Sequence, residues 1–565
     1  MQKYYNYIFI FLIPLTAIFF SVSNYTIQVA VDPALIINGD IQIPDKNAEL
    51  YIFLKKQFSS TIQFSSFLLK MGLNIFQISK VLISITYLSF FLGVYLCIKS
   101  LISNIFTDIN SKILSYIITF IIVIIAQLEL GQGDYPVHYL SEHTYGLYGL
   151  AISTLLFGLV ANGNFKFVFF LSTFFVAIHG AHGIWFCGIL LLTIFIDRFL
   201  KKNFYKPREI IIGSLIGTLF FIISFFYNYI SFGPTEYFTI VESDLEIIEN
   251  WIKYWEDHRA TGEFNSIYLI KSFLFFLFLL ISLKFTNKYL NRNTKYLLIL
   301  ISVSIFFSSI IYILYKIFFD YVPMFLMVPM PTRFLNVHSI IAWPVIFALF
   351  IVYTKLISEK FKINLNKCYF GFLFFLFLIN ISNLNSYRKY FFYHYDQSIG
   401  IKSLLKNNPF RTRIAQFYTM FFYDPKEKLE DYAFWEHVKK VDKGYNWLAS
   451  PFLADKLLRY GNQLYLFHPR YFDAVLIDQT TGRRTKKIIE EIFDLPFNNP
   501  LGNGKKFTKF NKVEHVKKAY QNKDLDDWRT ILSEFHVKYV VVPINWKINL
   551  PLKLKGNNVA MYVIE

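Results

Sequence analysis

YLLILISVSIFFSSIIYILYKIF, residues 296–318, contains one charged side chain, Lys316. A helix needs about 20 apolar residues to cross the hydrocarbon core of a bilayer, which is about 30 Å thick, so this run is long enough. Similar runs recur along the chain, at 5–22, 80–98, 113–128, 145–161, 166–181, 183–196, 209–229, 267–283, 296–318, 336–354 and 368–384. The sequence therefore predicts an α-helical polytopic membrane protein with about eleven transmembrane helices.

The composition agrees with this class, because 55% of the residues are hydrophobic, 20% are aromatic and the mean hydropathy is +0.39. The apolar runs are continuous, which favours helices over the alternating strands of a membrane barrel. No small-residue cleavage site follows the first run, 5–22, so we expect it to be a retained signal anchor. Gly180, His182 and Gly183 interrupt 166–196, which is either a hairpin or one broken helix.

Basic residues gather in three short loops between the predicted helices. They are Arg198, Lys201, Lys202, Lys206 and Arg208; Lys284, Lys288, Arg292 and Lys295; and Lys355, Lys360, Lys362 and Lys367. With about eleven spans these loops share one side, which the positive-inside rule makes cytoplasmic, together with the N-terminus. The outer side then receives loops 24–77, 129–143, 230–265 and 319–335, and the C-terminal part of the chain. We expect a multi-pass protein of a bacterial inner (cytoplasmic) membrane.

Several classes of function are disfavoured. Cys97, Cys187 and Cys368 lie in or beside apolar runs, so a disulfide framework or a structural zinc site is not expected. The chain has no phosphate-binding glycine loop, no nucleophile elbow and no HExxH metal motif. We therefore expect neither soluble nucleotide chemistry nor a nucleic-acid partner.

The first predicted outer loop begins with VDPALIINGDIQIPD, residues 31–45. Its carboxylates, Asp32, Asp40 and Asp45, follow the first apolar run closely, where a carboxylate could act as a general base at the membrane surface. Asp-Pro and Asn-Gly-Asp are also turn signals, so these carboxylates could equally be turn and cap residues. Behind them, residues 49–72 have the spacing of a helix that lies in the membrane interface.

The second predicted outer loop is rich in ionisable residues. They are Glu129, Asp134, His138, Glu142 and His143. Such a cluster could bind a divalent metal ion or a phosphate-bearing ligand, although its spacings match no metal motif. Glu142 or His143 could instead begin the next helix. A divalent metal ion is therefore the one candidate cofactor.

A pair of histidines lies in HGAHGIWF, residues 179–186. His179 and His182 stand three residues apart at the outer end of the interrupted run. Ionisable groups at membrane depth are costly and tend to face a polar cavity, which favours a functional role. Each ring could also be an ordinary interface histidine beside glycines that permit close helix packing.

The outer loop 230–265 is acidic, and apolar residues recur in it at spacings of three and four. They are Val241, Leu245, Ile248, Ile252 and Trp255. This pattern predicts an amphipathic helix with a mostly solvated acidic face. We expect the patch Trp255–Arg259 to lie where this helix returns to the membrane.

The outer passage 319–335 contains Pro323, Pro329 and Pro331, so it is not one regular span and is expected to be a re-entrant or surface segment. Arg333 lies at the entrance to the tenth predicted span. Its guanidinium could hold a lipid phosphate through two parallel hydrogen bonds, or it could be an interface arginine that extends toward water.

After residue 386 the apolar runs shorten, and we expect two domains, 1–386 in the membrane and an extracytoplasmic α/β domain over 387–565. The predicted strands are 463–467, 472–477, 538–542 and 559–564, and the predicted helices include 402–406 and 525–535. Basic residues could approach anionic lipid or polymer, or simply be solvated. They include Arg470, Arg483, Arg484, Lys486 and Lys487.

This layout resembles the GT-C superfamily of polyprenyl-phosphate-dependent glycosyltransferases: one span, a long outer loop with an early Asp, many further spans and an outer α/β domain. More narrowly, DPALIINGD at 32–40, the HGAHG motif and the MPTRFL passage resemble a group of uncharacterised bacterial GT-C-like membrane proteins. The Asp-Glu pair of some GT-C subfamilies is absent from the first loop.

The resemblance implies an inverting sugar transfer from a polyprenyl-phosphate-linked donor to a glycan, lipid or protein acceptor at the outer face of the bilayer. A first-loop carboxylate would take the proton of the acceptor hydroxyl, with Asp40 as the first choice and Asp32 as the second. Arg333, aided by His179 or His182, would hold the donor phosphate. Asp134, His138, Glu142 and His143 are further candidates to line the cavity.

Two other functions stay open. A transporter or flippase of lipid-linked sugars should show repeated halves or matching broken helices, and the sequence shows no such symmetry. A non-catalytic assembly factor for envelope polysaccharide would keep the fold without a convergent pocket. Convergence of an aspartate, a histidine and Arg333 on one cavity would favour transfer over the assembly role.

Overall fold

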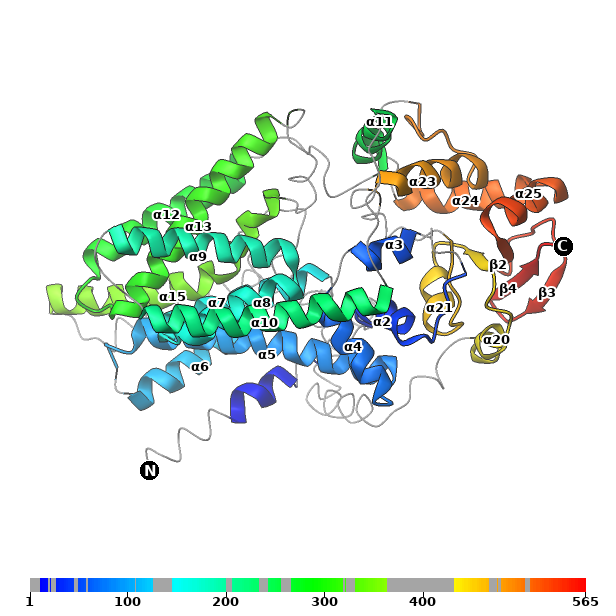
Figure 1. The fold of residues 1–565 in the computed structure, drawn as a ribbon. Coiled ribbons are helices and arrows are strands. Elements are labelled where there is room, and N and C mark those ends of the chain that lie inside the picture. Colours follow the sequence, from blue (N-terminus) through cyan, green and yellow to red (C-terminus); the bar gives the residue numbers. More distant parts are fainter. Residues whose placement is uncertain are drawn as a thin grey trace, which may run out of the picture.

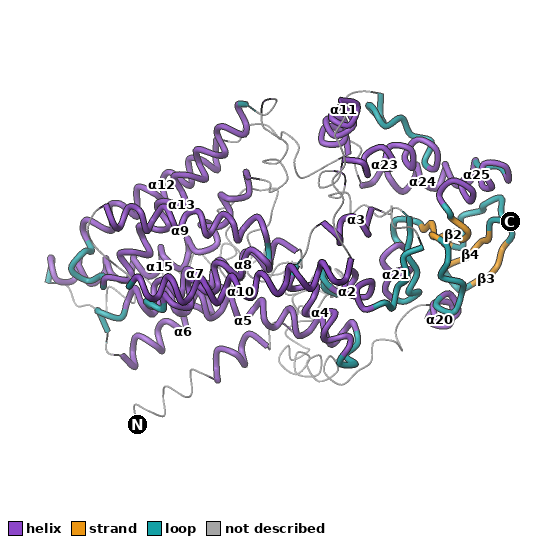
Figure 2. The backbone as a smooth tube through the Cα atoms, viewed as in Figure 1, coloured by secondary structure: helices purple, strands orange, loops and turns teal. Residues whose placement is uncertain are grey.

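The computed structural model describes residues 11–18, 21, 27–44, 49–56, 59–106, 108–124, 145–199, 206–232, 242–255, 266–318, 321, 331–362, 431–466, 475, 479–502 and 509–565. The fold is mostly helical, with a bundle of apolar helices at one end and a small sheet with further helices at the other (Figures 1 and 2). The short helices α2 (Val31–Asn38), α3 (Glu49–Lys56) and α4 (Ser60–Lys70) lie between these two parts (Figure 1).

The described part of the bundle comprises α5 (Ile75–Ile102), α6 (Asp108–Ile124), α7 (Tyr145–Asn162), α8 (Phe165–Ile178), α9 (Gly180–Phe199), α10 (Pro207–Phe232), α12 (Ser266–Phe285), α13 (Arg292–Ile317), the 3-10 turn η3 (Pro331–Arg333) and α15 (Phe334–Phe361). Within the described residues, six helical stretches are long and apolar enough to cross a membrane: α5, α9, α10, α12, α13 and η3 with α15. The apolar stretches in α6, α7 and α8 are shorter.

These helices match nine of the predicted apolar runs within the described residues. The run 368–384 and half of 5–22 lie outside them. The interruption in 166–196 is a hairpin, because α8 ends at Ile178, His179 is extended and α9 begins at Gly180. A Cβ on Gly183 would lie 2.6 Å from Val176 Cα, so only glycine allows α8 and α9 to pack this closely.

The predicted basic loops meet at the end of the bundle that faces away from the sheet. Lys288 Nζ, between α12 and α13, lies 2.8 Å from Glu359 Oε2 near the end of α15. At the same end Asn104, just after α5, donates to the carbonyl of Tyr289 at 3.0 Å. Because α9 ends and α10 begins where these helices turn back, Arg198 and Arg208 belong to this end as well.

The passage 31–45 differs from its predicted turns. Asp32 and Pro33 lie in the first turn of α2 (Val31–Asn38), so the Asp-Pro signal begins a helix instead of a turn. The Asn-Gly-Asp signal is confirmed, since Gly39 ends α2 with φ 85°, a left-handed conformation that glycine adopts without strain. Asp45 lies outside the described residues.

The predicted interfacial helix over 49–72 is two helices, α3 (Glu49–Lys56) and α4 (Ser60–Lys70). Gln63 in α4 anchors to α10, because its Nε2 donates to the carbonyl of Ser224 at 2.8 Å and its Oε1 accepts from the Ser224 hydroxyl at 2.7 Å. The two helices therefore pack on the bundle beside α2.

The C-terminal region, residues 431–565, contains one four-stranded sheet among its described residues, in the order β1-β2-β4-β3. β1 (Asn446–Ala449) is parallel to β2 (Val537–Pro543), while β3 (Leu552–Lys555) and β4 (Val559–Val563) form an antiparallel hairpin on the other side of β2. A parallel pair needs a crossover connection, which here contains α21 (Ala454–Arg459), α23 (Gln479–Ile492), α24 (Lys509–Asn522) and α25 (Leu525–Phe535). Helix α20 (Tyr432–Val438) precedes β1.

The predicted strands 538–542 and 559–564 and the predicted helix 525–535 are confirmed. The strand over 463–467 is wrong, since its described residues form only an isolated bridge from Tyr465 to Trp447. Most of 472–477 and all of 402–406 lie outside the described residues. Two of the predicted basic surface residues are engaged within the protein, because Arg483 pairs with Asp244 and Lys487 with Glu534.

The segment between α10 and α12 packs on the C-terminal region. It forms α11 (Glu242–Asn250) and the π-helical turn η1 (Trp251–Trp255), close to α23 (Figure 1). Ile248, Trp251 and Trp255 are buried in one hydrophobic cluster with residues of α23 and α25. The expectation that Trp255 lies at the membrane is therefore wrong, and Glu256–Arg259 lie outside the described residues.

The expected solvation of the acidic face holds only in part. Glu246 and Glu249 are exposed, but Asp244 is 1% exposed and accepts two hydrogen bonds from Arg483. These bonds raise the pKa of Arg483.

The α2 segment, residues 27–44, also shares a core with the C-terminal region. Val31 and Leu35 of α2 belong to the same hydrophobic cluster as Trp447 of β1 and Leu458 of α21. The C-terminal region thus buries apolar side chains from two distant parts of the chain, the α2 segment and residues 242–255. These contacts place both segments at the same end of the bundle as the sheet.

Candidate functional site

His179 and His182 meet at the α8–α9 turn. Their ring centroids are 4.3 Å apart and their planes are inclined by 15°, so the rings are stacked. The backbone N–H of His182 donates to His179 Nδ1 at 3.4 Å. The stack follows from the extended conformation of His179, which brings its ring over the first turn of α9.

Gly149 of α7 makes room for the His182 ring. A Cβ at Gly149 would lie 2.9 Å from His182 Cγ and nearer still to Nδ1. His182 is 5% exposed, and its Nδ1 is buried with no hydrogen-bond partner among the described residues. A buried polar atom without a partner costs about 1–3 kcal/mol, so the position of this ring needs a reason other than stability.

Arg333 lies at the same end of the bundle as this histidine pair. It is the last residue of η3 and directly precedes α15. The next residue, Phe334, stacks on Trp185 of α9 with 4.4 Å between ring centroids and 4° between planes. Because Trp185 is one helical turn after His182, this stack holds the start of α15 against the histidine end of α9.

Trp185 adds a second buried donor at this place. Its Nε1 is buried and has no hydrogen-bond partner among the described residues. Trp185 and His182 lie three residues apart on α9 and therefore share one helix face. We name His179, His182, Trp185 and Arg333 the histidine–arginine site.

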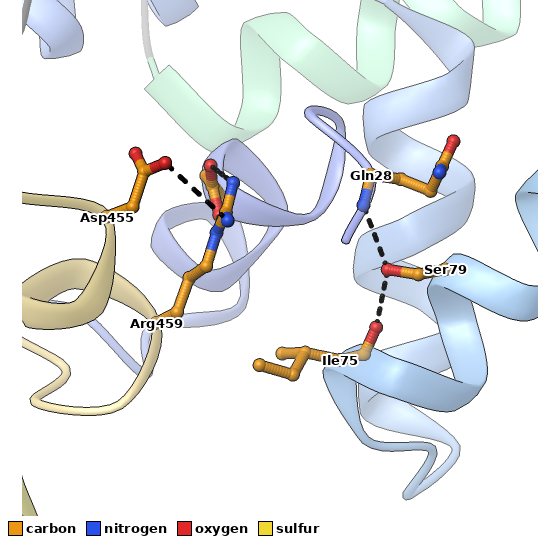
Figure 3. Close-up of polar contacts among 6 residues, drawn as sticks. Gln28, Ile75, Ser79, Asp455 and Arg459 are labelled. Atoms are coloured by element: carbon orange, nitrogen blue, oxygen red, sulfur yellow. Dashed lines mark hydrogen bonds and ion pairs between the residues drawn. The ribbon is translucent and has the colours of Figure 1, made fainter. Parts of the chain in front are cut away.

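Two contacts join the histidine–arginine site to the first loop. The Ser59 hydroxyl, just before α4, donates to the carbonyl of Ile178 at 3.3 Å. Tyr148, next to Gly149 on α7, donates to Gln28 Oε1 at 3.2 Å. The backbone N–H of Gln28 in turn donates to Ser79 Oγ at 3.0 Å, which ties the start of the α2 segment to α5 (Figure 3).

Asp32 is held by the C-terminal region. Arg459, the last residue of α21, donates from Nε to Oδ1 at 2.7 Å and from Nη2 to Oδ2 at 2.8 Å. Asp455 lies 3.7 Å from the remaining nitrogen of Arg459, whose side chain reaches from α21 to the α2 coil (Figure 3). Asp32 is 1% exposed, so both carboxylate oxygens are engaged in a buried pair.

Asp40 has a different surrounding. Its Oδ2 accepts from Asn38 Nδ2 at 2.7 Å, its backbone carbonyl accepts from Lys443 Nζ at 3.0 Å, and its side chain is half-buried. Among the described residues, no side chain donates a hydrogen bond to the other carboxylate oxygen, Oδ1.

The predicted residues thus fall into two groups. The structure stacks His179 on His182 and packs Phe334, the neighbour of Arg333, on Trp185 of the same helix, whereas Asp32 and Asp40 contact the C-terminal region. Asp134, His138, Glu142 and His143 lie outside the described residues. Among the residues that are described, no group of three or more His, Cys, Asp or Glu side chains could hold a metal ion.

Sequence reasoning missed Trp185 and Arg459. Trp185 could have been found, because it follows His182 by three residues within HGIW and shares its helix face. No local signal marks Arg459, whose partner is 427 residues away. The chain matches no protein-family model, no curated protein and no solved structure.

Proposed function

We propose that this chain is a GT-C-like membrane glycosyltransferase, which moves a sugar from a polyprenyl-phosphate donor to a glycan, lipid or protein acceptor. The observation that carries the proposal is that the stacked pair His179 and His182 lies at the same end of the apolar bundle as Arg333, whose neighbour Phe334 stacks on Trp185. A guanidinium beside two imidazoles and a buried indole N–H suits a phosphate, whose oxygens accept several hydrogen bonds.

The location suits a lipid-linked phosphate. Helices α8, α9 and α15 carry the histidine–arginine site at their ends, and apolar residues of α9 such as Ile184 and Leu191 are largely exposed on the surface of the bundle. A polyprenyl chain could lie along such a face while its phosphate reaches Arg333. The acceptor would arrive from the aqueous side, where the C-terminal region lies.

The proposed topology has about eleven transmembrane helices in a bacterial inner membrane. The three basic loops lie at the end of the bundle remote from the C-terminal region, and the positive-inside rule would make that end cytoplasmic. The α2 segment, residues 242–255 and the C-terminal region would then be extracytoplasmic.

In the proposed reaction Asp40 is the general base. It takes the proton of the acceptor hydroxyl while the oxygen attacks the anomeric carbon; the bond from this carbon to the phosphate oxygen breaks with inversion, and polyprenyl phosphate leaves. Arg333 and the histidines would stabilise the leaving phosphate. Asp40 is preferred to Asp32 because Arg459 already engages both oxygens of Asp32.

The donor site is tested by binding of a polyprenyl phosphate to the purified protein in detergent, with the matching polyprenol as the phosphate-free probe. Hydrogen bonds to charged groups contribute about 1.5–3 kcal/mol, so Arg333→Ala should weaken phosphate binding about 10- to 150-fold and leave polyprenol binding unchanged. Arg208→Ala, at the opposite end of the bundle, is the matched control. Equal affinities of the Arg333→Ala and wild-type proteins would reject the site.

Catalysis is tested separately by mass spectrometry of lipid-linked and surface glycans. A strain that carries Asp40→Asn should show the same missing sugar as a deletion strain, while the variant protein is expressed at the wild-type level. A wild-type glycan profile in the Asp40→Asn strain would remove Asp40 from the role of base.

A non-catalytic assembly factor is the second candidate, and one observation favours it. Asp32 is bound by Arg459, and the described contacts of Asp40 lead to the C-terminal region rather than to the histidine–arginine site. Under this alternative Arg333→Ala would still weaken polyprenyl-phosphate binding, whereas Asp40→Asn would leave every glycan unchanged.

A further inference from the structure

Beside the shared hydrophobic cluster, polar and aromatic side chains of the C-terminal region contact the α2 segment and the start of α5. Lys443 donates to the carbonyl of Asp40, two residues after the end of α2. Tyr460, next to Arg459, lies beside Phe76 with 6.3 Å between ring centroids. The pair between Asp32 and Arg459 joins two side chains by two parallel hydrogen bonds, so it fixes orientation as well as distance.

Helix α2 depends on such contacts. It has eight residues, and an isolated helix of this length is not stable in water. No side chain caps its N-terminus. Its position must therefore come from packing and from the one charged residue of its first turn, Asp32. Since Asp40 follows the helix by two residues, whatever orients α2 also orients Asp40.

We infer that Arg459 is a positioning residue, which acts through Asp32 to hold the α2 segment, and with it Asp40, in place against the C-terminal region. The part of this inference that concerns transfer rests on the proposed function. Asp32 then serves as the anchor for a guanidinium and takes no part in proton transfer. The C-terminal region sets where the proposed base lies.

A second pair of the same kind provides an internal comparison. Arg483 of α23 donates to Asp244 of α11 from Nε at 2.5 Å and from Nη2 at 2.8 Å. Asp244 is as deeply buried as Asp32, but the Arg483 side chain is 52% exposed, against 10% for Arg459. The two pairs hold different segments, so loss of one should loosen its own segment alone.

The test measures the mobility of a nitroxide spin label on each segment of the full-length protein in lipid nanodiscs. In a background without Cys97, Cys187 and Cys368, the label is placed at Gln42→Cys or at Glu249→Cys, both at exposed positions. Arg459→Met should raise the mobility at position 42 and leave position 249 unchanged, and Arg483→Met should do the reverse.

Arg459→Lys provides a second, more conservative variant that keeps the inference testable when Arg459→Met does not fold. It keeps a positive charge beside Asp32 but cannot form two parallel hydrogen bonds, so we expect an intermediate rise in mobility at position 42. Unchanged mobility at position 42 in both Arg459 variants would overturn the inference. So would an equal response of both labels to either substitution, because this would indicate general loosening.

An apolar replacement of the pair separates positioning from catalysis. A well-packed apolar pair can replace a buried ion pair without loss of structure, so Asp32→Leu combined with Arg459→Met should keep the label at position 42 immobile. We expect this double variant to retain the wild-type glycan profile. Loss of the sugar with an immobile label would show that Asp32 takes part in the chemistry and would overturn the inference. If the deletion strain shows no missing sugar, the proposed function fails, while the label measurements still decide the role of Arg459.

Discussion

Substitution of Gly149 by alanine should disable the histidine–arginine site without removing any of its polar groups. The added Cβ would lie 2.9 Å from His182 Cγ, whereas an ordinary contact begins at 3.4 Å. The ring must therefore shift by at least about 0.5 Å, and by more at Nδ1, or α7 and α9 must separate. Either change moves His182 relative to Arg333.

The expected effect on binding follows from one hydrogen bond. If His182 donates to the donor phosphate, its loss costs about 1.5–3 kcal/mol, which weakens binding of a polyprenyl phosphate about 10- to 150-fold. The free energy of unfolding should fall by about 1–3 kcal/mol through the crowding. Binding of the phosphate-free polyprenol should not change.

Gly188 offers a matched control, because it lies in α9, the helix that carries His182. A Cβ at Gly188 meets no atom within 4 Å. Gly188→Ala should leave affinity unchanged and stabilise the protein by up to about 1 kcal/mol, because alanine favours a helix. Dissociation constants from native mass spectrometry and thermal unfolding in the same detergent measure both quantities.

A double substitution tests whether Gly149→Ala acts through the His182 ring. In His182→Ala the ring is absent, so adding Gly149→Ala should weaken binding no further. Additive losses in the double variant would show that Gly149→Ala acts elsewhere than on His182. Wild-type affinity in Gly149→Ala would show that the position of His182 has no bearing on the phosphate.

Two further predictions concern the same helices. Trp185→Phe keeps an aromatic ring against Phe334 but removes the indole N–H, which has no described partner, together with part of the ring system. The unfolding temperature should fall slightly because of the smaller ring, while polyprenyl-phosphate affinity falls about fivefold and polyprenol affinity does not change. Unchanged polyprenyl-phosphate affinity would show that this N–H does not bind the phosphate. Gly158→Ala would place a Cβ 2.8 Å from Gly93 Cα, so it should separate α5 from α7. The free energy of unfolding, measured by thermal unfolding, should fall by about 1–3 kcal/mol. Wild-type stability of Gly158→Ala would contradict the close crossing of these helices.

Much of the bundle could be predicted because each long apolar helix coincides with a continuous apolar run in its own sequence. A run such as 296–318 is apolar from end to end, and its helix, α13, follows from that run alone. The proximity of His179 and His182 could also be predicted, because these residues are three positions apart and have glycines beside them. The order of the spans also predicted Arg333 at the same end of the bundle as this pair.

The rest depended on contacts between distant parts of the chain. The partner of Asp32 is 427 residues away, so no spacing near Asp32 predicts it. The apolar stripe of residues 242–255 indicated a helix correctly, but an apolar stripe does not say whether a membrane or another part of the protein covers it. Here Trp255 donates to the carbonyl of Phe497 at 2.9 Å, which assigns the stripe to the C-terminal region.

The wide separation of these partners also has a consequence for biosynthesis. Arg459 is synthesised 427 residues after Asp32, a delay of roughly 20–90 s at about 5–20 residues per second. Phe497, whose carbonyl accepts from Trp255, is synthesised 242 residues after Trp255. During this interval α2 and residues 242–255 present uncovered apolar faces and unpaired carboxylates. This end of the molecule is therefore assembled late, and a chain whose synthesis stops before Arg459 keeps an α2 segment without its partner, which a protease or chaperone can recognise.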